Sequence, residues 1–455
     1  MIDRCVARRQ RLVKIAIAVG VTVAFATTAC SSGGEAPPAG GGASAATQSD
    51  IAAALQKDTT ITFWGWAPQT DDVVAAFEKA YPKVKVKLLN VGSNATEYTK
   101  LQNVIKAKSG VPDVAQLEYM MLPQFAFGKS LVDLNKYGVS SVADKFTKST
   151  WSQAHVGDAL YGLPQDSGPL AMFYRQDVFA QYGLTVPKTW DEYIAVAKKL
   201  HTADPSKFIT ADSGDPSFTN SMIWAAGGTP YTVSGSKISV NLGDKGSTKW
   251  ADMWSQLVDT GLVDTKAAIW SPDWLSGLAN GKYATWIAGG WGAGSLKNHV
   301  PTASGKWRVA PLPQYSGDVT ASAEHGGSTM AVLTASNNKL AAIGFSQWFT
   351  TNAGANQIWV DEGGFPSQTG VLKSSDWINK PVSYFGDQEI NKVFKDSSDA
   401  VLSGWQYLPF TLYANSIYGD TVGQAFANKS GIASGLTAWQ KSIISYGNEQ
   451  GFTVK

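Results

Sequence analysis

Hydrophobic residues between positions 59 and 117 recur with two different periods. Helical spacing predicts helices over residues 70–81 and 98–107, and Thr70 is expected to be the N-cap of the first. Three short segments before, between and after these helices have the alternating or apolar pattern of strands: Thr60–Trp64, Val84–Leu88 and Asp113–Leu117. The resulting βαβαβ order favours a parallel sheet covered by helices.

The same patterns continue along the rest of the chain. Thr189 and Glu192 form a capping box that predicts a helix running to about His201. Helical spacing also predicts helices over 250–258, 341–349 and 436–444. The tryptophans on their apolar faces are therefore expected in hydrophobic cores: Trp250, Trp254, Trp348 and Trp439. Strand and helix signals alternate without a long linker after residue 50. We therefore expect an α/β protein of two lobes between which the chain crosses more than once.

The N-terminus has the pattern of an export signal. A basic stretch precedes the apolar run Ile15–Ala26, which is too short to span a bilayer, so residues 1–29 are predicted to be a signal peptide. The following Cys30 resembles the lipidated cysteine of a bacterial lipobox, although Thr27 replaces the usual aliphatic residue. Arg8-Arg9 also loosely resembles a twin-arginine signal, which leaves the export route open. The alternative for Cys30 is an unmodified thiol.

Cysteine content and the next segment favour a membrane anchor at Cys30. Only Cys5 and Cys30 are present, so the mature chain would have neither an internal disulfide nor a cysteine-based metal site. Ser31–Ser49 consists largely of small residues with Glu35 as the only charge, and residues 30–57 are expected to form a flexible tether.

Charge and aromatic content restrict the class of ligand. The sequence has 38 basic and 36 acidic residues, and beyond the predicted signal peptide the acidic ones are in slight excess. There is no basic surplus to hold a phosphate backbone, so a nucleic-acid partner is not expected. The 17 tryptophans are a first indication of function, because a flat indole is the kind of surface that can pack against the apolar C–H face of a sugar ring.

Tryptophans outside helical patterns are the candidate sugar platforms. Two lie at the predicted carboxyl end of the first strand, where ligands of parallel sheets usually bind. Two follow a strand-like run and flank Gly289-Gly290, which would allow backbone to approach a ligand closely. The candidates, for which hydrophobic core is the alternative, are Trp64, Trp66, Trp224, Trp286, Trp291 and Trp405.

Carboxylates supply the second part of the predicted site, since an ionised oxygen is a strong acceptor for sugar hydroxyls. Glu118 directly follows a predicted strand, and Asp166 follows Gly-Leu-Pro. Glu324 and His325 precede Gly326-Gly327 and are weaker candidates.

Several segments, in this order, resemble the family 1 extracellular solute-binding proteins of carbohydrate ABC importers. The resemblance covers most of residues 58–455. The segments that carry it are Ile61–Trp66, Gly110–Tyr119, Leu160–Asp166 leading into Phe173–Arg175, Pro187–Glu192, Gly281–Trp291 with Trp307–Pro313, and Gly326–Ser328.

The resemblance implies two α/β lobes, each a mostly parallel sheet flanked by helices, around a sugar-binding cleft. The expected N-lobe comprises 58–167 and about 322–365, and the C-lobe 168–321 and about 366–455. Crossings are expected near 166–173, 316–322 and 361–371. The family often uses an acid at the position of Asp166, and brings backbone into the cleft at Gly327.

The resemblance implies capture of a di- or oligosaccharide by lobe closure and delivery to an ABC importer permease. The chain is expected to be a monomer at the extracellular face of the cell membrane, without a cofactor. A secreted glycan-active enzyme is the first alternative, because Glu118 and Asp166 could flank a scissile bond. No nucleophile elbow, phosphate-binding loop or metal-ligand spacing of histidines accompanies them. The second alternative is a binding protein for a solute other than a sugar.

Overall fold

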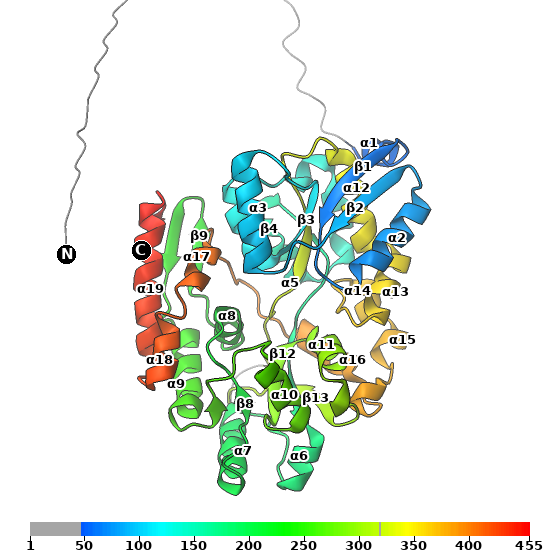
Figure 1. Ribbon diagram of the computed structural model, residues 1–455. Coiled ribbons are helices and arrows are strands. Elements are labelled where there is room, and N and C mark those ends of the chain that lie inside the picture. The colour runs from blue at the N-terminus through cyan, green and yellow to red at the C-terminus, as the bar shows by residue number, and fades with distance from the viewer. Residues whose placement is uncertain (1–46, 318–319) are drawn as a thin grey trace, which may run out of the picture. The chain divides into compact units, whose positions relative to one another are not determined.

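The computed structural model describes residues 47–317 and 320–455 (Figure 1). The predicted signal peptide and Cys30 lie outside these residues. Within them, no helix is long and apolar enough to cross a bilayer.

The first sheet contains all three strands predicted near the N-terminus. Its order is β2-β1-β3-β14-β6. The strands β1 (Thr59–Trp64), β2 (Val84–Leu89) and β3 (Val114–Glu118) are parallel, as predicted. By contrast, β14 (Ser328–Val332) is antiparallel to β3 and to β6 (Leu163–Pro164). The sheet is therefore mixed.

Helices cover this sheet. They are α2 (Thr70–Ala80), α3 (Ala95–Ala107) and α12 (Lys339–Thr351), which agree with the predicted helices. Phe77 of α2 packs against Phe345 of α12, with ring centroids 4.8 Å apart. The prediction of Thr70 as an N-cap was wrong. Gln69 occupies that position, and Thr70 is the first helical residue, with a buried hydroxyl that caps nothing.

The predicted tether does not extend to residue 57. Residues Gln48–Ala54 form helix α1, which starts at a capping box between Thr47 and Asp50. Ile51 and Leu55 are buried and join the core beneath the first sheet, against α12. Two apolar residues one helical turn apart are enough to dock this short helix, although the composition around it is typical of a tether.

The second sheet differs from the expected parallel arrangement. Its order is β12-β7-β13, and both pairings are antiparallel. The strands are β7 (Leu170–Arg175), β12 (Thr285–Gly289) and β13 (Trp307–Pro311). All six residues of β7 except Tyr174 are buried, and alternate side chains enter two different hydrophobic clusters. A strand buried on both faces has no polar alternation, so the direction of its neighbours could not be predicted from its pattern.

Helices also cover the second sheet. The capping box of Thr189 and Glu192 starts α7 (Trp190–Ala203), as predicted. The predicted helices α9 (Lys245–Asp259) and α19 (Ile432–Glu449) are present and bury Trp250, Trp254 and Trp439 completely, whereas Trp348 is half-buried. Further elements used below are η1 (Tyr119–Met121), α5 (Lys148–Gln153), α8 (Pro216–Ala225), β9 (Tyr231–Ser234), β11 (Val263–Asp264), α10 (Pro272–Asn280), α11 (Gly292–His299), α13 (Ala353–Asp361), α16 (Ile390–Asp399) and α17 (Thr411–Ser416).

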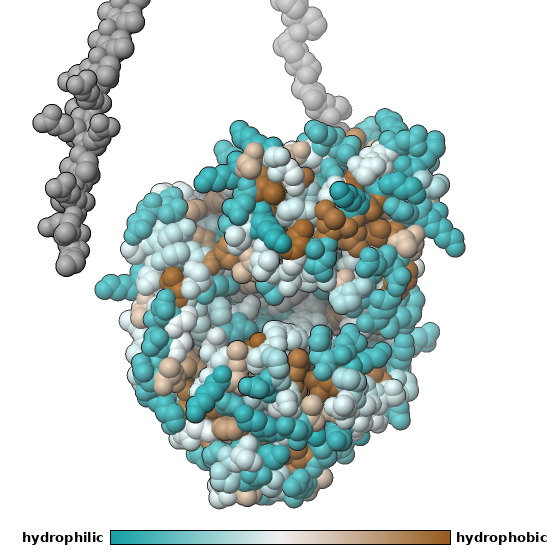
Figure 2. All heavy atoms as spheres, viewed as in Figure 1, coloured by the Kyte–Doolittle hydropathy of each residue, from teal (hydrophilic) through white to brown (hydrophobic). Residues whose placement is uncertain are grey.

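Three segments connect the two sheets. The first links β6 to β7, and the second links β13 to β14. The third links α13, which packs on α2, to α16, which packs on β7 and β13. Isolated β-bridges pair Asp166 with Pro366 and Pro169 with Glu324, so these segments lie side by side. Figure 2 shows a hollow across the middle of the visible face, between the parts built on the two sheets.

Candidate functional site

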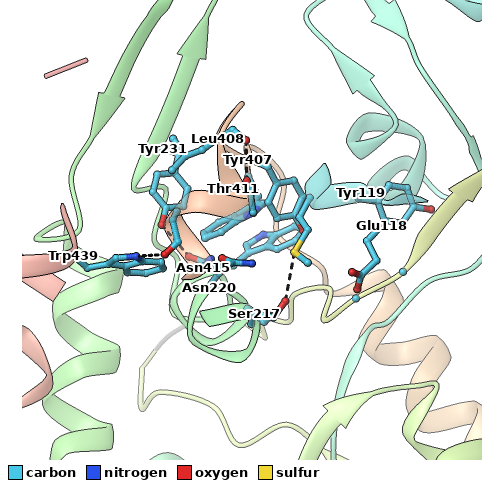
Figure 3. A pocket seen from close by; sticks show the side chains of 17 residues that line it. Glu118, Tyr119, Ser217, Asn220, Tyr231, Tyr407, Leu408, Thr411, Asn415 and Trp439 are labelled. Atoms are coloured by element: carbon cyan, nitrogen blue, oxygen red, sulfur yellow. Dashed lines mark hydrogen bonds between the residues drawn. The ribbon is translucent and has the colours of Figure 1, made fainter. Parts of the chain in front are cut away.

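A pocket lies beside the connecting segments and is lined from several parts of the fold (Figure 3). It contains about 520 Å³ of space that no atom occupies, part of it open to solvent. The first sheet contributes Glu118, Tyr119 and Met120, together with Gly326-Gly327 before β14. The rest of the wall comes from α8, β9, α17, α19 and the loop before α17: Ser217, Asn220, Ser221, Trp224, Tyr231, Trp405, Tyr407, Leu408, Thr411, Ala414, Asn415 and Trp439.

Two predicted platforms, Trp224 and Trp405, form the aromatic wall. Their rings are stacked, with centroids 5.3 Å apart and 9° between the planes. Tyr231 and Tyr407 meet Trp405 edge-on from two directions, at 5.8 and 6.1 Å. The Trp224 indole N–H donates to the carbonyl of Leu402, which holds the stack in place. Four aromatic rings therefore make one continuous apolar surface.

Polar atoms lie close to this wall. The Trp405 indole nitrogen and the Asn415 side-chain oxygen are buried, and neither has a hydrogen-bond partner among the described residues. Asn220 accepts a hydrogen bond from the Tyr231 hydroxyl, which leaves its amide NH₂ group as a donor. A buried donor or acceptor without a partner costs free energy, so such groups suit a ligand that carries hydroxyls.

Glu118 forms the acidic edge of the pocket. One of its carboxylate oxygens accepts a hydrogen bond of 2.6 Å from the Tyr98 hydroxyl. Burial raises the pKa of Glu118 to about 7, although the Tyr98 hydrogen bond acts in the opposite direction. Glu97 is fully buried beside it, has no hydrogen-bond partner among the described residues, and has a pKa raised by burial to about 9. Glu97 is therefore neutral at pH 7, and Glu118 changes its charge near neutral pH.

Asp166 lies behind this edge rather than in the lining of the pocket. Its backbone carbonyl accepts a hydrogen bond from the Tyr119 hydroxyl, and its carboxylate accepts one from the backbone N–H of Ser328. The pKa of Asp166 is raised to about 7, first by burial and then by the nearby carboxylates of Glu118 and Glu324, while the hydrogen bond from Ser328 acts in the opposite direction. Asp166 therefore orders the segment around Gly327 and adds negative charge near the pocket.

Gly326 and Gly327 bring backbone to the pocket, at the position expected from the resemblance. Both have positive φ, +77° and +92°, which favours glycine. A Cβ on Gly327 would come 2.8 Å from the Tyr119 ring, so glycine is needed for packing as well as for conformation.

Glu324 serves the connecting segments rather than the pocket. It is almost fully buried and accepts hydrogen bonds from the hydroxyls of Ser149 and Ser167 and from the backbone N–H of Gly168. Its carboxylate thus links α5, which packs on β6 of the first sheet, to the segment that leads to the second. His325, also a weaker candidate, packs its ring against those of Phe218 and Trp291, and neither acid nor imidazole lines the pocket.

Trp291 lies next to the pocket without lining it. Its indole N–H donates a hydrogen bond of 2.6 Å to the His325 carbonyl, and a Cβ on Gly326 would lie 3.3 Å from the same nitrogen. The role predicted for Gly289-Gly290 was wrong. A Cβ on Gly289 would meet the Trp291 indole at 2.5 Å, and one on Gly290 would meet the Phe365 ring at 2.6 Å. These glycines accommodate protein side chains.

The remaining predicted platforms are placed away from the pocket. Trp64 is buried in the core of the first sheet, and Trp286 is buried in a core of the second, between Trp274 and Trp291. Trp66 is half-buried, and its ring meets that of Tyr98 edge-on at 6.2 Å. The pattern of strand ends that selected Trp64 and Trp286 does not distinguish a side chain that faces a ligand from one that faces a helix.

Several lining residues had no signal in the sequence. Tyr231, Tyr407, Asn220 and Asn415 come from separate elements, and none belongs to a motif with recognisable spacing. Only Tyr407, two residues after Trp405, could have been suggested by its neighbour. Among the residues that the structure describes, no group of His, Cys, Asp and Glu side chains has an arrangement that could hold a metal ion.

Comparisons with known proteins identify the family of this chain. Residues 65–356 match a family model described as bacterial extracellular solute-binding protein. A solved structure of the ABC transporter associated binding protein from B. animalis subsp. lactis Bl-04, in complex with beta-1,6-galactobiose, is similar at 39% identity with a TM-score of 0.80. That match covers 87% of this chain and 99% of the other.

Two further relatives support the same family. The galacto-N-biose-/lacto-N-biose I-binding protein of the ABC transporter from Bifidobacterium longum is 28% identical, with a TM-score of 0.76, and the match covers 87% of this chain and 98% of the other. A lactose-binding protein of Rhizobium radiobacter is 24% identical over 74% of this chain and 81% of its own length. The chain belongs to the bacterial extracellular solute-binding protein family, with the two-lobed fold that the sequence predicted.

Proposed function

We propose that this protein captures a di- or oligosaccharide outside the cell and delivers it to the permease of an ABC importer. The observation that carries the proposal is the pocket in which stacked Trp224 and Trp405 lie across from the carboxylate of Glu118. The ligands named for similar proteins, beta-1,6-galactobiose, lacto-N-biose and lactose, support a small sugar.

The wall of the pocket suits the two-sided chemistry of a sugar. The aromatic surface can pack against C–H groups, and the Trp405 indole N–H and the Asn415 side-chain oxygen, which have no partner among the described residues, can bond to hydroxyls. Glu118 accepts hydroxyl hydrogen bonds more strongly when it is ionised. Several aromatic rings suit more than one sugar unit, which favours a disaccharide or a longer chain.

Delivery requires a change of shape that depends on the ligand. Glu118 and Gly326 belong to the side of the first sheet, whereas Trp224 and Trp405 belong to the core of the second. A sugar that touches both sides favours the closed form by its differential affinity. We propose lobes of 58–167 with 322–365 and of 168–321 with 366–455, which hinge at the connecting segments and dock in the closed form on the permease.

The same proposal covers location. A lipid on Cys30 and the short tether that follows it would hold a monomeric body at the extracellular face of the membrane. Mass spectrometry of the protein from membranes tests this part. A mass lacking residues 1–29 and carrying an acyl-modified cysteine is expected, and an unmodified Cys30 in the exported chain would contradict it.

Binding without a covalent step is the proposed mode of action. The purified chain from residue 30 onward, with Cys30→Ser, is titrated with beta-1,6-galactobiose, lacto-N-biose, lactose and arabino-oligosaccharides by calorimetry and Trp fluorescence. We expect saturable binding of at least one sugar, unchanged in composition after incubation. Absence of heat and quenching for the whole panel would overturn the proposal. Hydrolysis that is lost in Glu118→Ala or Asp166→Ala would instead favour the glycan-active enzyme.

A further inference from the structure

Trp270 is the exposed large hydrophobic residue of the described chain, with 47% of its surface accessible. It lies in the loop between β11 and α10 and does not line the pocket. An indole is costly to leave in water, and the 16 other tryptophans are buried or half-buried. The position of Trp270 therefore calls for a physical reason.

The backbone at Trp270 is held in an unfavourable conformation. Its φ is +68°, which is rare for a bulky residue. The backbone N–H of Ser271 donates to the carbonyl of Ala268 at 3.0 Å, so residues 268–271 form a β-turn with Trp270 at its third position. Glycine or asparagine usually occupies such a position when φ is positive. Strain of this kind is concentrated at functional sites, including ligand clamps.

Local contacts also make the Trp270 side chain rigid. Ser271 is the N-cap of α10 and accepts a hydrogen bond from the N–H of Trp274, and Pro272 opens the helix. The Trp270 ring packs against the ring of Trp274, with centroids 5.3 Å apart, and meets the ring of buried Trp286 edge-on at 6.2 Å. The indole is thus held in place before any ligand arrives, which reduces the entropy that binding would cost.

A continuous path of contacts leads from Trp270 to the pocket. Its ring lies 6.1 Å from that of Trp291, at an angle of 34°. Trp291 in turn donates its indole N–H to His325 and lies against Gly326, which lines the pocket. Trp291 and Trp270 therefore form a chain of aromatic contacts that begins beside Gly326 at the pocket and ends at the exposed Trp270 ring.

We propose that Trp270 is an outer platform that stacks against a further sugar ring of a trisaccharide or longer ligand. This inference rests on the proposed function, and it specifies the substrate class: oligosaccharides of at least three units gain affinity from Trp270, and disaccharides do not. An outer platform explains exposure, rigidity and backbone strain together, whereas packing against the core explains the rigidity alone.

The test compares two probes that differ by one sugar unit. Beta-1,6-galactobiose and beta-1,6-galactotriose are titrated calorimetrically into the wild-type chain and into Trp270→Ala. We expect Trp270→Ala to lose about tenfold in affinity for the trisaccharide, equivalent to about 1.4 kcal/mol, and to stay within about twofold for the disaccharide. Trp270→Tyr, which keeps a ring, is expected to retain most of the trisaccharide affinity. Trp348→Ala, on the helix α12, is the matched control with no expected effect on either probe.

Other outcomes separate the two proposals. If Trp270→Ala binds both probes as the wild type does, the outer platform is overturned and the proposed function stands. If the wild type binds neither probe nor any sugar of the wider panel, the proposed function itself fails. Trp270→Gly suits the positive φ, so its melting temperature should be at least that of the wild type. Trp270→Gly should also lose affinity for the trisaccharide and not for the disaccharide. This variant keeps the test valid if Trp270→Ala folds poorly.

Discussion

The indole of Trp224 lies parallel to that of Trp405, with centroids 5.3 Å apart and 9° between the ring planes. Trp224 lies in the last turn of α8, and Trp405 lies in the loop before α17, so two distant segments must pack correctly before this wall exists. The Trp224 indole N–H is occupied by the carbonyl of Leu402, whereas the nitrogen of Trp405 has no partner among the described residues. Trp224 therefore positions the stack, and Trp405 has the donor left for a ligand.

Removing the indole of Trp405 should weaken sugar binding. In Trp405→Phe the apolar wall is largely kept, but the N–H donor and part of the surface are lost. We expect about 2 kcal/mol less binding free energy, or roughly thirtyfold weaker affinity, by calorimetry. Trp348→Ala is the control, since that residue packs on α2. Unchanged affinity in Trp405→Phe, with an unchanged melting temperature, would contradict the assignment.

Affinity for a neutral sugar should depend on pH near 7. The pKa values of Glu118 and Asp166 are raised to about 7, so both carboxyls ionise as the pH rises from 6 to 8. An ionised Glu118 accepts hydroxyl hydrogen bonds more strongly, and affinity should increase severalfold over this range. Binding at pH 7 should also release protons, seen as a dependence of the heat on the buffer. Glu118→Gln should flatten the profile, and a profile with the same slope in that variant would argue against Glu118 as the acceptor.

Glu97 should make the folded state less stable at alkaline pH. Its pKa rises from the ordinary 4.5 to about 9 in the folded protein, so the native state holds a proton that the unfolded state has released. Stability from this source is complete below about pH 4.5 and is lost as the pH rises toward 9. Glu97→Gln removes the titrating carboxyl and keeps a buried side chain of nearly the same size. The melting temperature of the variant should match the wild type at pH 4.5 and exceed it by a few °C at pH 8.5.

Alanine substitutions of Gly327 and Gly305 should distinguish the cost of backbone strain from the cost of a steric clash. Both have positive φ, +92° and +78°, but a Cβ on Gly327 would meet the Tyr119 ring at 2.8 Å, whereas a Cβ on Gly305 would meet nothing within 4 Å. Gly305→Ala should cost about 1 kcal/mol of stability from strain alone. Gly327→Ala should cost about 1–3 kcal/mol more and should also weaken sugar binding. Equal losses of stability, with full binding in both variants, would show that the Tyr119 contact is unimportant.

Acidic sugars should be excluded from the pocket. No lysine or arginine is among the described residues that line it, and Glu118 lies at its edge with Asp166 behind. A uronic acid in the ligand would face like charge without compensation. We expect a disaccharide containing a uronic acid to bind at least a hundredfold more weakly than beta-1,6-galactobiose. The difference in affinity between the neutral and the acidic disaccharide should become smaller below pH 6, because Glu118 becomes protonated. Comparable affinities for the two disaccharides at pH 8 would refute the prediction.

The sequence by itself determined the elements and the class of protein. The strands β1 to β3 and the helices α2, α3, α7, α9, α12 and α19 follow from local periodicity and from caps, because those signals depend only on near neighbours. The capping box of Thr189 and Glu192, which starts α7, is an example of such local determination. The ordered segments from Ile61 to Ser328 were sufficient to indicate the family.

Only the tertiary structure decided which aromatic side chains line the pocket. Trp64 and Trp405 have similar exposure, yet Trp64 faces a core and Trp405 faces the pocket. The antiparallel second sheet, the docking of α1 and the role of Glu324 between connecting segments likewise depend on contacts between distant residues. The physical reason is that periodicity specifies which face of an element is apolar. What that face meets is set by how the chain crosses between its two sheets.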